Sequence, residues 1–207
     1  TEQVTAMAVD FAPARGLRTL GKATLDAKEA TMSSAAVPRH PSDTMPTRGV
    51  VFIHACPRAL SPHMEWAVSQ VLGIDVSLEW TGQPVAPGSV RGELSWQAPA
   101  GTGAALASAL VGFAPLRFEV TEEPTSTREG ERFAVTPGLG MFRATIGIHG
   151  DMMLSEDRVR SAMADAADSD DLSKRLRHLL GAEWDEELEP FRYAGEGASV
   201  RWLHQVG

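Results

Sequence analysis

Apolar and polar residues follow a regular pattern from Gly49 onward. Short apolar runs and strict alternation, which are typical of strands, are interleaved with apolar residues at helical spacing over about 70 residues. In chain order they predict a strand at 50–53, a helix at 61–72, strands at 74–80 and 90–96, a helix at 103–111 and a strand at 116–121. This order of elements is that of the ferredoxin-like βαββαβ fold. The pattern therefore predicts an α+β protein whose core spans residues 49–121.

Residues 131–207 predict an added β-hairpin and C-terminal helices. Serine and aspartate are favoured N-caps, and glycine is a favoured helix end, so such residues mark the helix boundaries. In chain order we expect a hairpin of strands at 132–136 and 141–148, helices capped by Ser155 and Asp171, and a final strand within 191–206.

Residues 1–44 differ in composition from the rest of the chain. Apolar residues from Val4 to Phe11 fall at helical spacing, and alanine, serine, threonine and proline dominate the stretch after Phe11. The sequence predicts a flexible or partly helical N-terminal extension here. It predicts a single α+β domain over residues 45–207.

The charge of the chain is unevenly distributed. Its formal net charge is −8, which argues against a protein that coats nucleic acid or an anionic membrane. The extension is neutral, so the whole excess of acids lies in residues 45–207, and residues 156–189 hold 11 acids against five bases. Such a run is more often a solvated helical face than a docking surface for a basic partner.

Cys56 is the single cysteine, so no intramolecular disulfide can form. No stretch of about 18 apolar residues is present, and the N-terminus lacks the layout of a signal peptide. We therefore expect a cytoplasmic protein that does not enter the membrane. No ligand spacing for a metal and no phosphate-binding loop stand out, so no cofactor is predicted.

One group of residues could serve catalysis or small-molecule binding. His54 and Cys56 close the first predicted strand, and side chains at i and i+2 of a strand share a face. A thiol beside an imidazole is the minimal nucleophile pair, and Arg58, His63 and Glu65 follow within ten residues. However, no acid is adjacent to orient the imidazole, and a lone cysteine is more often a small buried side chain. An enzyme or small-molecule-binding domain at this place is the alternative hypothesis.

A second group could bind a protein partner. The chain has five tryptophans against one tyrosine, and two of the tryptophans are flanked by charge outside the predicted core. Exposed aromatic side chains are frequent anchors of protein interfaces. The candidate partner-binding residues are Trp184, Asp185, Glu186, Glu187, Phe191, Arg192, Tyr193 and Trp202.

Four stretches of the sequence resemble one known family. They are MPTRGVVFIHACPRALSPHMEWAVSQVLGIDVSLEW, RGELSWQAPAGTG, LRFEVTEEP and the tail WDEELEPFRYAGEGASVRWLHQVG. Together they are similar to the actinobacterial domain of unknown function 3145 over residues 45–207, with Cys56 a departure from the small residues expected there.

The resemblance implies a non-enzymatic protein with no catalytic residues to carry over. It implies a regulator that binds subunits of a long-chain acyl-CoA carboxylase and inhibits the enzyme, which supplies precursors of mycolic acids. An acidic segment around Trp184 could compete at an acyl-CoA entrance lined by cations.

Overall fold

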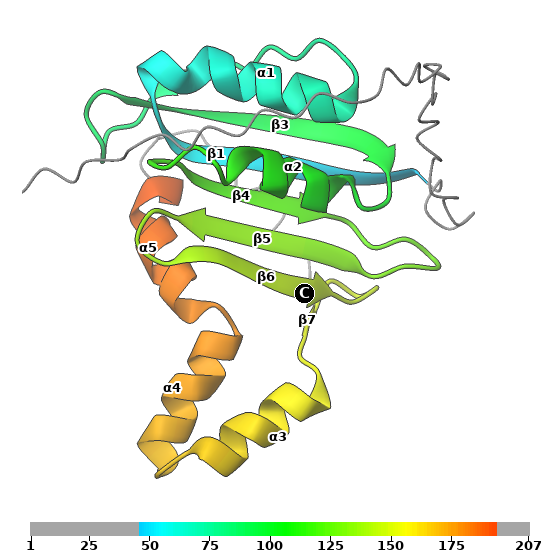
Figure 1. The fold of residues 1–207 in the computed structure, drawn as a ribbon, viewed down its shortest axis with the longest axis vertical. Coiled ribbons are helices and arrows are strands. Elements are labelled where there is room, and N and C mark those ends of the chain that lie inside the picture. The colour runs from blue at the N-terminus through cyan, green and yellow to red at the C-terminus, as the bar shows by residue number, and fades with distance from the viewer. Residues whose placement is uncertain (1–45, 194–207) are drawn as a thin grey trace, which may run out of the picture. The chain divides into compact units, whose positions relative to one another are not determined.

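Seven strands form one antiparallel sheet in the computed structural model, which describes residues 46–193 (Figure 1). The strand order is β2-β3-β1-β4-β5-β6-β7, and every neighbouring pair is antiparallel. The strands are β1 (Pro46–Pro57), β2 (Thr81–Gly82), β3 (Ser89–Pro99), β4 (Arg117–Glu122), β5 (Gly130–Thr136), β6 (Gly140–Ile146) and β7 (Met152–Met153). The helices are α1 (Ser61–Leu72), α2 (Thr102–Leu110), α3 (Glu156–Asp165), α4 (Ser169–Leu179) and α5 (Ala182–Tyr193).

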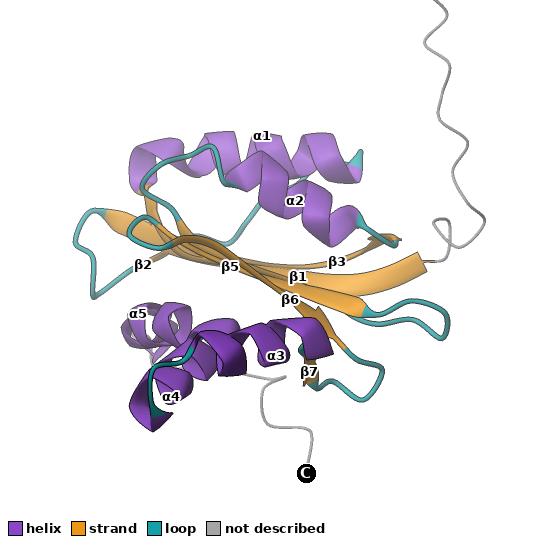
Figure 2. Ribbon diagram, turned by 60° about the horizontal axis from the view of Figure 1, so that its bottom comes forward, coloured by secondary structure: helices purple, strands orange, loops and turns teal. Residues whose placement is uncertain are grey.

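The first half of the sheet confirms the predicted α+β class and ferredoxin-like core. Its order, β2-β3-β1-β4, is the one produced when two right-handed βαβ crossovers interleave. α1 and α2 pack against each other and cover one face of the sheet (Figure 2). β5 and β6 extend the sheet beyond β4 as the predicted hairpin.

The larger hydrophobic core lies between the sheet and these two helices. Strand residues such as Val51 and Phe118 meet Met64 of α1 and Leu106 of α2 there, and each is at most 1% exposed. Gly49 of β1 faces Trp96 of β3, and a Cβ atom at Gly49 would lie 2.2 Å from the Trp96 ring. Only glycine therefore fits at this close approach.

The predicted strand at 74–80 is wrong, although its alternation is real. Val76 and Leu78 are buried and their neighbours are exposed, but the segment forms no strand, and pairing with β3 begins only at β2. The Val76 N–H donates to Ser69 Oγ at 3.0 Å, and the Leu78 N–H donates to Glu65 Oε1 at 2.8 Å. Side chains of α1 thus accept the hydrogen bonds that a neighbouring strand would have accepted.

The C-terminal part departs from the prediction at two places. Phe191 to Tyr193 end helix α5 instead of starting a strand, and the rest of the predicted final strand lies outside the described residues. The cap of α4 is Asp168, whose carboxylate accepts from the Asp171 N–H at 2.8 Å, so this helix begins before the predicted Asp171. Ser155 does precede α3 as its N-cap residue. The predicted extension at 1–44 also lies outside the described residues.

Within residues 46–193, none of the helices has the length and apolar character that a membrane span requires.

Candidate functional site

A β-bulge in β1 separates the two residues of the predicted nucleophile pair. Ile53 is opposite Gly92, but Cys56 is opposite Val90, so β1 carries one residue more than β3 across this interval. The extra residue reverses the alternation of faces. Cys56 therefore points into the core beneath α1 and α2, whereas His54 points to the opposite face, where α5 lies (Figure 2).

The environment of Cys56 does not suit a nucleophile. The residue is fully buried, its Sγ lies 3.3 Å from the Pro57 carbonyl oxygen, and burial raises the pKa of the thiol to about 11. A nucleophilic cysteine instead needs a lowered pKa and access to substrate. Cys56 acts here as a small core residue.

The other members of this predicted group do not converge with His54 either. Arg58 and His63 are exposed, on the turn before α1 and on α1. Glu65 accepts hydrogen bonds from the Leu78 N–H at 2.8 Å and from Trp80 Nε1 at 3.0 Å, so it holds the segment after α1 in place. The structure therefore does not gather the five residues into one pocket.

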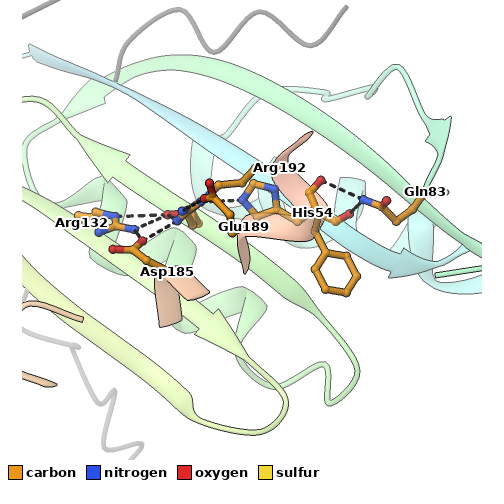
Figure 3. A network of polar contacts seen from close by, with 8 residues as sticks. His54, Gln83, Arg132, Asp185, Glu189 and Arg192 are labelled. Carbon is orange, nitrogen blue, oxygen red and sulfur yellow. Dashed lines mark hydrogen bonds and ion pairs between the residues drawn. The ribbon is translucent and has the colours of Figure 1, made fainter. Parts of the chain in front are cut away.

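His54 belongs instead to a buried network of charged groups, which we call the ionic latch. Its members are His54 of β1, Glu119 of β4, Arg132 of β5, and Asp185 and Arg192 of α5 (Figure 3). Three neighbouring strands and one helix thus meet at a single carboxylate.

Both oxygens of Glu119 accept hydrogen bonds. Oε2 lies 2.7 Å from His54 Nε2 and 2.9 Å from Arg192 Nε. Oε1 lies 2.7 Å from Arg132 Nη2 and 2.7 Å from Arg192 Nη2. Asp185 bridges the same two guanidinium groups from α5, and the more exposed Glu189 lies 3.5 Å from Arg192 Nη1.

The latch controls the ionisation of its members. Burial acts to raise the pKa of Glu119, but hydrogen bonds from His54 and Arg192 and the nearby charges outweigh it, and the pKa lies well below its usual range. Burial acts to lower the pKa of Arg192, yet the bonds and charge of Glu119 raise it above its usual range. Glu119 and both arginines are therefore charged at neutral pH. This favours a structural role, in which the ion pairs hold α5 on the sheet, over a role in proton transfer.

Gln83 extends the latch to the loop after β2. It is 3% exposed, and its Nε2 donates to the His54 carbonyl oxygen at 2.6 Å and to the Phe191 carbonyl oxygen at 3.3 Å. The Phe191 ring lies under the Arg117 guanidinium, 4.6 Å from the ring centroid to Cζ. The C-terminal end of α5 is thereby fixed to β1 and β4.

Trp184 is not the predicted surface anchor. It is 7% exposed, packs on Phe142 with ring centroids 5.2 Å apart, and donates from Nε1 to the Gly140 carbonyl oxygen at 3.0 Å. With Leu188, Ala134 and Ala144 it forms a second, smaller core between α5 and β5–β6. The prediction of a surface position is wrong because Asp185 and Glu187, close to Trp184 on α5, bind side chains of the sheet and turn this face of the helix inward.

In addition to Phe191, four of the other predicted partner-binding residues have contacts within the fold. Asp185 and Arg192 belong to the latch, and Glu187 accepts from Thr136 Oγ1 at 2.8 Å. Glu186 is exposed and paired with Arg177, and Tyr193 is 63% exposed. Trp202 lies outside the described residues. That these residues bind a partner stays a prediction.

Sequence reasoning missed Glu119 and Arg132. Both occupy polar positions of alternating strands, which normally face solvent. One feature of the sequence could have indicated their burial. C-terminal helices are predicted after the sheet, and these helices must cover a face of it, so polar residues in its middle strands can be buried. Within the described part of the chain, no three His, Cys, Asp or Glu side chains are grouped as metal ligands.

α3 and α4 form a helical hairpin that supplies no residue to either core, although the His178 ring of α4 lies 5.4 Å from the Trp184 ring, centroid to centroid. α3 packs mainly on α4, and α4 packs on α3 and α5, so the hairpin lies away from the sheet (Figure 1). Ala162 is the one buried residue of α3, and α4 has none.

Comparison with known proteins gives one match. The family profile described as "Protein of unknown function (DUF3145)" matches residues 50–205. No curated protein and no solved structure matches the chain. Because the profile covers most of the chain, including both cores, this protein belongs to the DUF3145 family of proteins of unknown function.

Proposed function

We propose that this protein is a non-enzymatic regulator that acts by binding another protein, a long-chain acyl-CoA carboxylase. The observation that carries the proposal is the α3–α4 hairpin, which contributes to neither core. Helices of 10 and 11 residues are marginal in water without tertiary packing. A partner surface would supply the burial that the hairpin lacks.

Exposed apolar side chains support a binding role. Met163 of α3 and Leu180 at the end of α4 are 63% and 44% exposed. On the other side of the sheet, Trp66 of α1 is 63% exposed. Large apolar and aromatic residues on a surface are typical anchors of protein interfaces.

The choice of carboxylase as the partner is supported by the family resemblance alone. His54, Cys56 and His63 do not come together in the structure. The alternative hypothesis, an enzyme or small-molecule-binding domain that uses these residues, therefore has no observation in its favour.

Affinity purification of the tagged full chain from its native cytoplasm tests the proposal. We expect carboxylase subunits to be recovered. Met163→Pro should abolish their recovery, because proline within α3 costs about 3 kcal/mol of helix stability. Met163→Leu, which keeps both the helix and the exposed apolar side chain, is the matched control and should retain them.

The Met163→Pro variant should keep its sheet and both cores, because Met163 packs in neither. A circular dichroism melt checks this. Recovery of a monomer with a bound metabolite, and no carboxylase, would contradict the proposal.

A further inference from the structure

An open groove of about 540 Å³ runs between α3 and α4. This volume lies within the range of natural binding sites. Its lining residues are Asp157, Arg158, Ser161, Ala162 and Asp165 of α3, Lys174, Arg175, His178 and Leu179 of α4, and Glu183 of α5.

The apolar face of the hairpin is only half covered. Val159 of α3 and Leu172, Leu176 and Leu179 of α4 are of intermediate exposure, although they occupy helical core spacing. Two helices can bury one side of such a stripe, and a third is needed to close it. Ala162 leaves room at the groove floor because its side chain is small. The groove therefore has the shape and apolar floor that an amphipathic helix fills.

The charges that line the groove are unequally neutralised within the protein. Arg175 bonds to Asp171 at 2.9 Å, and His178 Nδ1 lies 2.7 Å from Glu183. Arg160, next to the groove on α3, pairs with Glu156 and lies 3.8 Å from Asp157. These groups are already provided with counter-charges.

Arg158 and Lys174 lack an ion-pair partner among residues 46–193. Lys174 acts electrostatically on Asp171, which Arg175 already pairs, and it is the sole lysine of residues 45–207. Asp165 is the one groove acid without a basic partner in the same described part. The groove lining holds three carboxylates and three fixed cations, but two of the cations and only one of the acids stand without an ion-pair partner among residues 46–193.

We infer that this groove binds an amphipathic helix of the partner protein, with aliphatic residues on Ala162 and Leu179 and carboxylates on Arg158 and Lys174. The inference rests on the proposed function and adds the contact surface and the chemistry that it recognises. The selection of an acidic helix follows from the cations that the fold leaves without counter-charges.

Two synthetic helical peptides of about 20 residues test it. Both carry leucines at i, i+3, i+4 and i+7, flanked by glutamates in one and by lysines in the other. Fluorescence anisotropy with the full chain should show the glutamate peptide binding at least about tenfold more tightly. The double variant Arg158→Glu/Lys174→Glu should reverse this preference.

Matched tryptophan variants test the place of binding. Ser161→Trp fills the groove and should weaken the glutamate peptide at least about tenfold. Ala164→Trp places the same side chain on α3 outside the groove lining and should leave the affinity unchanged. Equal affinity for the two peptides, no binding of either, or no effect of Ser161→Trp would overturn the inference.

The peptide assay is independent of the carboxylase. If the carboxylase binds and Ser161→Trp leaves that complex intact, the groove assignment fails and the proposed function stands. If the peptide results hold and no carboxylase is recovered, the groove assignment stands and the proposed partner fails.

Discussion

Glu119→Gln tests the importance of the ionic latch for holding α5 on the sheet. The substitution keeps the size of the side chain and removes its charge. The Arg132 and Arg192 side chains, which are 11% and 12% exposed, would then share Asp185, which is 39% exposed, and Arg192 would keep the 54% exposed Glu189 at 3.5 Å. Two largely buried guanidinium groups would lose their main counter-charge.

The expected cost depends on this burial. Removing one partner of a buried ion pair costs about 3–5 kcal/mol, because the remaining charge is left unpaired. For a domain of this size, each kcal/mol lowers Tm by about 2–4 °C. We therefore expect Glu119→Gln to lower Tm by about 6–20 °C.

Urea unfolding at pH 7, followed by circular dichroism, measures the change in the free energy of unfolding. Glu186→Gln is the matched control, because Glu186 is 66% exposed and pairs with Arg177 on the surface. Such a pair is worth less than about 1 kcal/mol. A Glu119→Gln variant as stable as the Glu186→Gln control would show that the ionic latch does not stabilise the fold.

The wild type and Glu119→Gln should also differ in their pH dependence. The folded state lowers the pKa of Glu119, so its contribution is fully present above the unfolded-state pKa of about 4.3 and is lost as pH falls toward the folded pKa. The stability difference between the wild type and Glu119→Gln should therefore shrink as the pH falls below about 4. A difference that grows as the pH falls below about 4 would contradict this sign.

Three single sites give further predictions. Gly181→Ala should lower the free energy of unfolding in urea by at least about 2 kcal/mol, because the residue has φ +74° and a Cβ would lie 2.6 Å from Phe142. Gly73→Ala, at φ +68° with open space around it, should cost about 1 kcal/mol. Equal costs would show that the Phe142 ring does not restrict position 181. Cys56 should react with iodoacetamide at pH 8 about two orders of magnitude more slowly than a free cysteine until the protein is unfolded, given its raised pKa of about 11, and rapid native labelling would refute its burial. Glu122→Gln should cost about 1–3 kcal/mol in the same unfolding assay, because its carboxylate accepts from two backbone N–H groups at the start of α2, at 2.7 Å each; an unchanged midpoint would refute this role.

The hydrophobic periodicity of the sequence predicted the order of elements, because burial of one face of a helix or strand directly imposes that periodicity. Alternation at Val76 and Leu78 records that one side of the segment is buried, and this is true in coil as in a strand. The secondary structure of this segment depends on which groups accept the hydrogen bonds of its backbone N–H groups. Here Glu65 and Ser69 of the preceding helix accept them, and no neighbouring strand does. Such side-chain acceptors leave no periodic signal.

The candidate site was less predictable because local spacing does not determine which face a residue takes. The bulge after Ile53 separates His54 from Cys56, and no residue type in that run marks it. Similarly, the acids beside Trp184 resembled a solvated face, but two of them bind arginines from strands more than 50 residues away in sequence. Long-range charge pairing of this kind becomes visible only in the fold.

Inhibition of a long-chain acyl-CoA carboxylase by this protein is tested most directly by measuring the rate of the purified carboxylase with increasing amounts of the full chain. We expect saturable inhibition with co-elution of the two proteins, and loss of both effects in Met163→Pro but not in Met163→Leu. An unchanged carboxylation rate together with separate elution would contradict it.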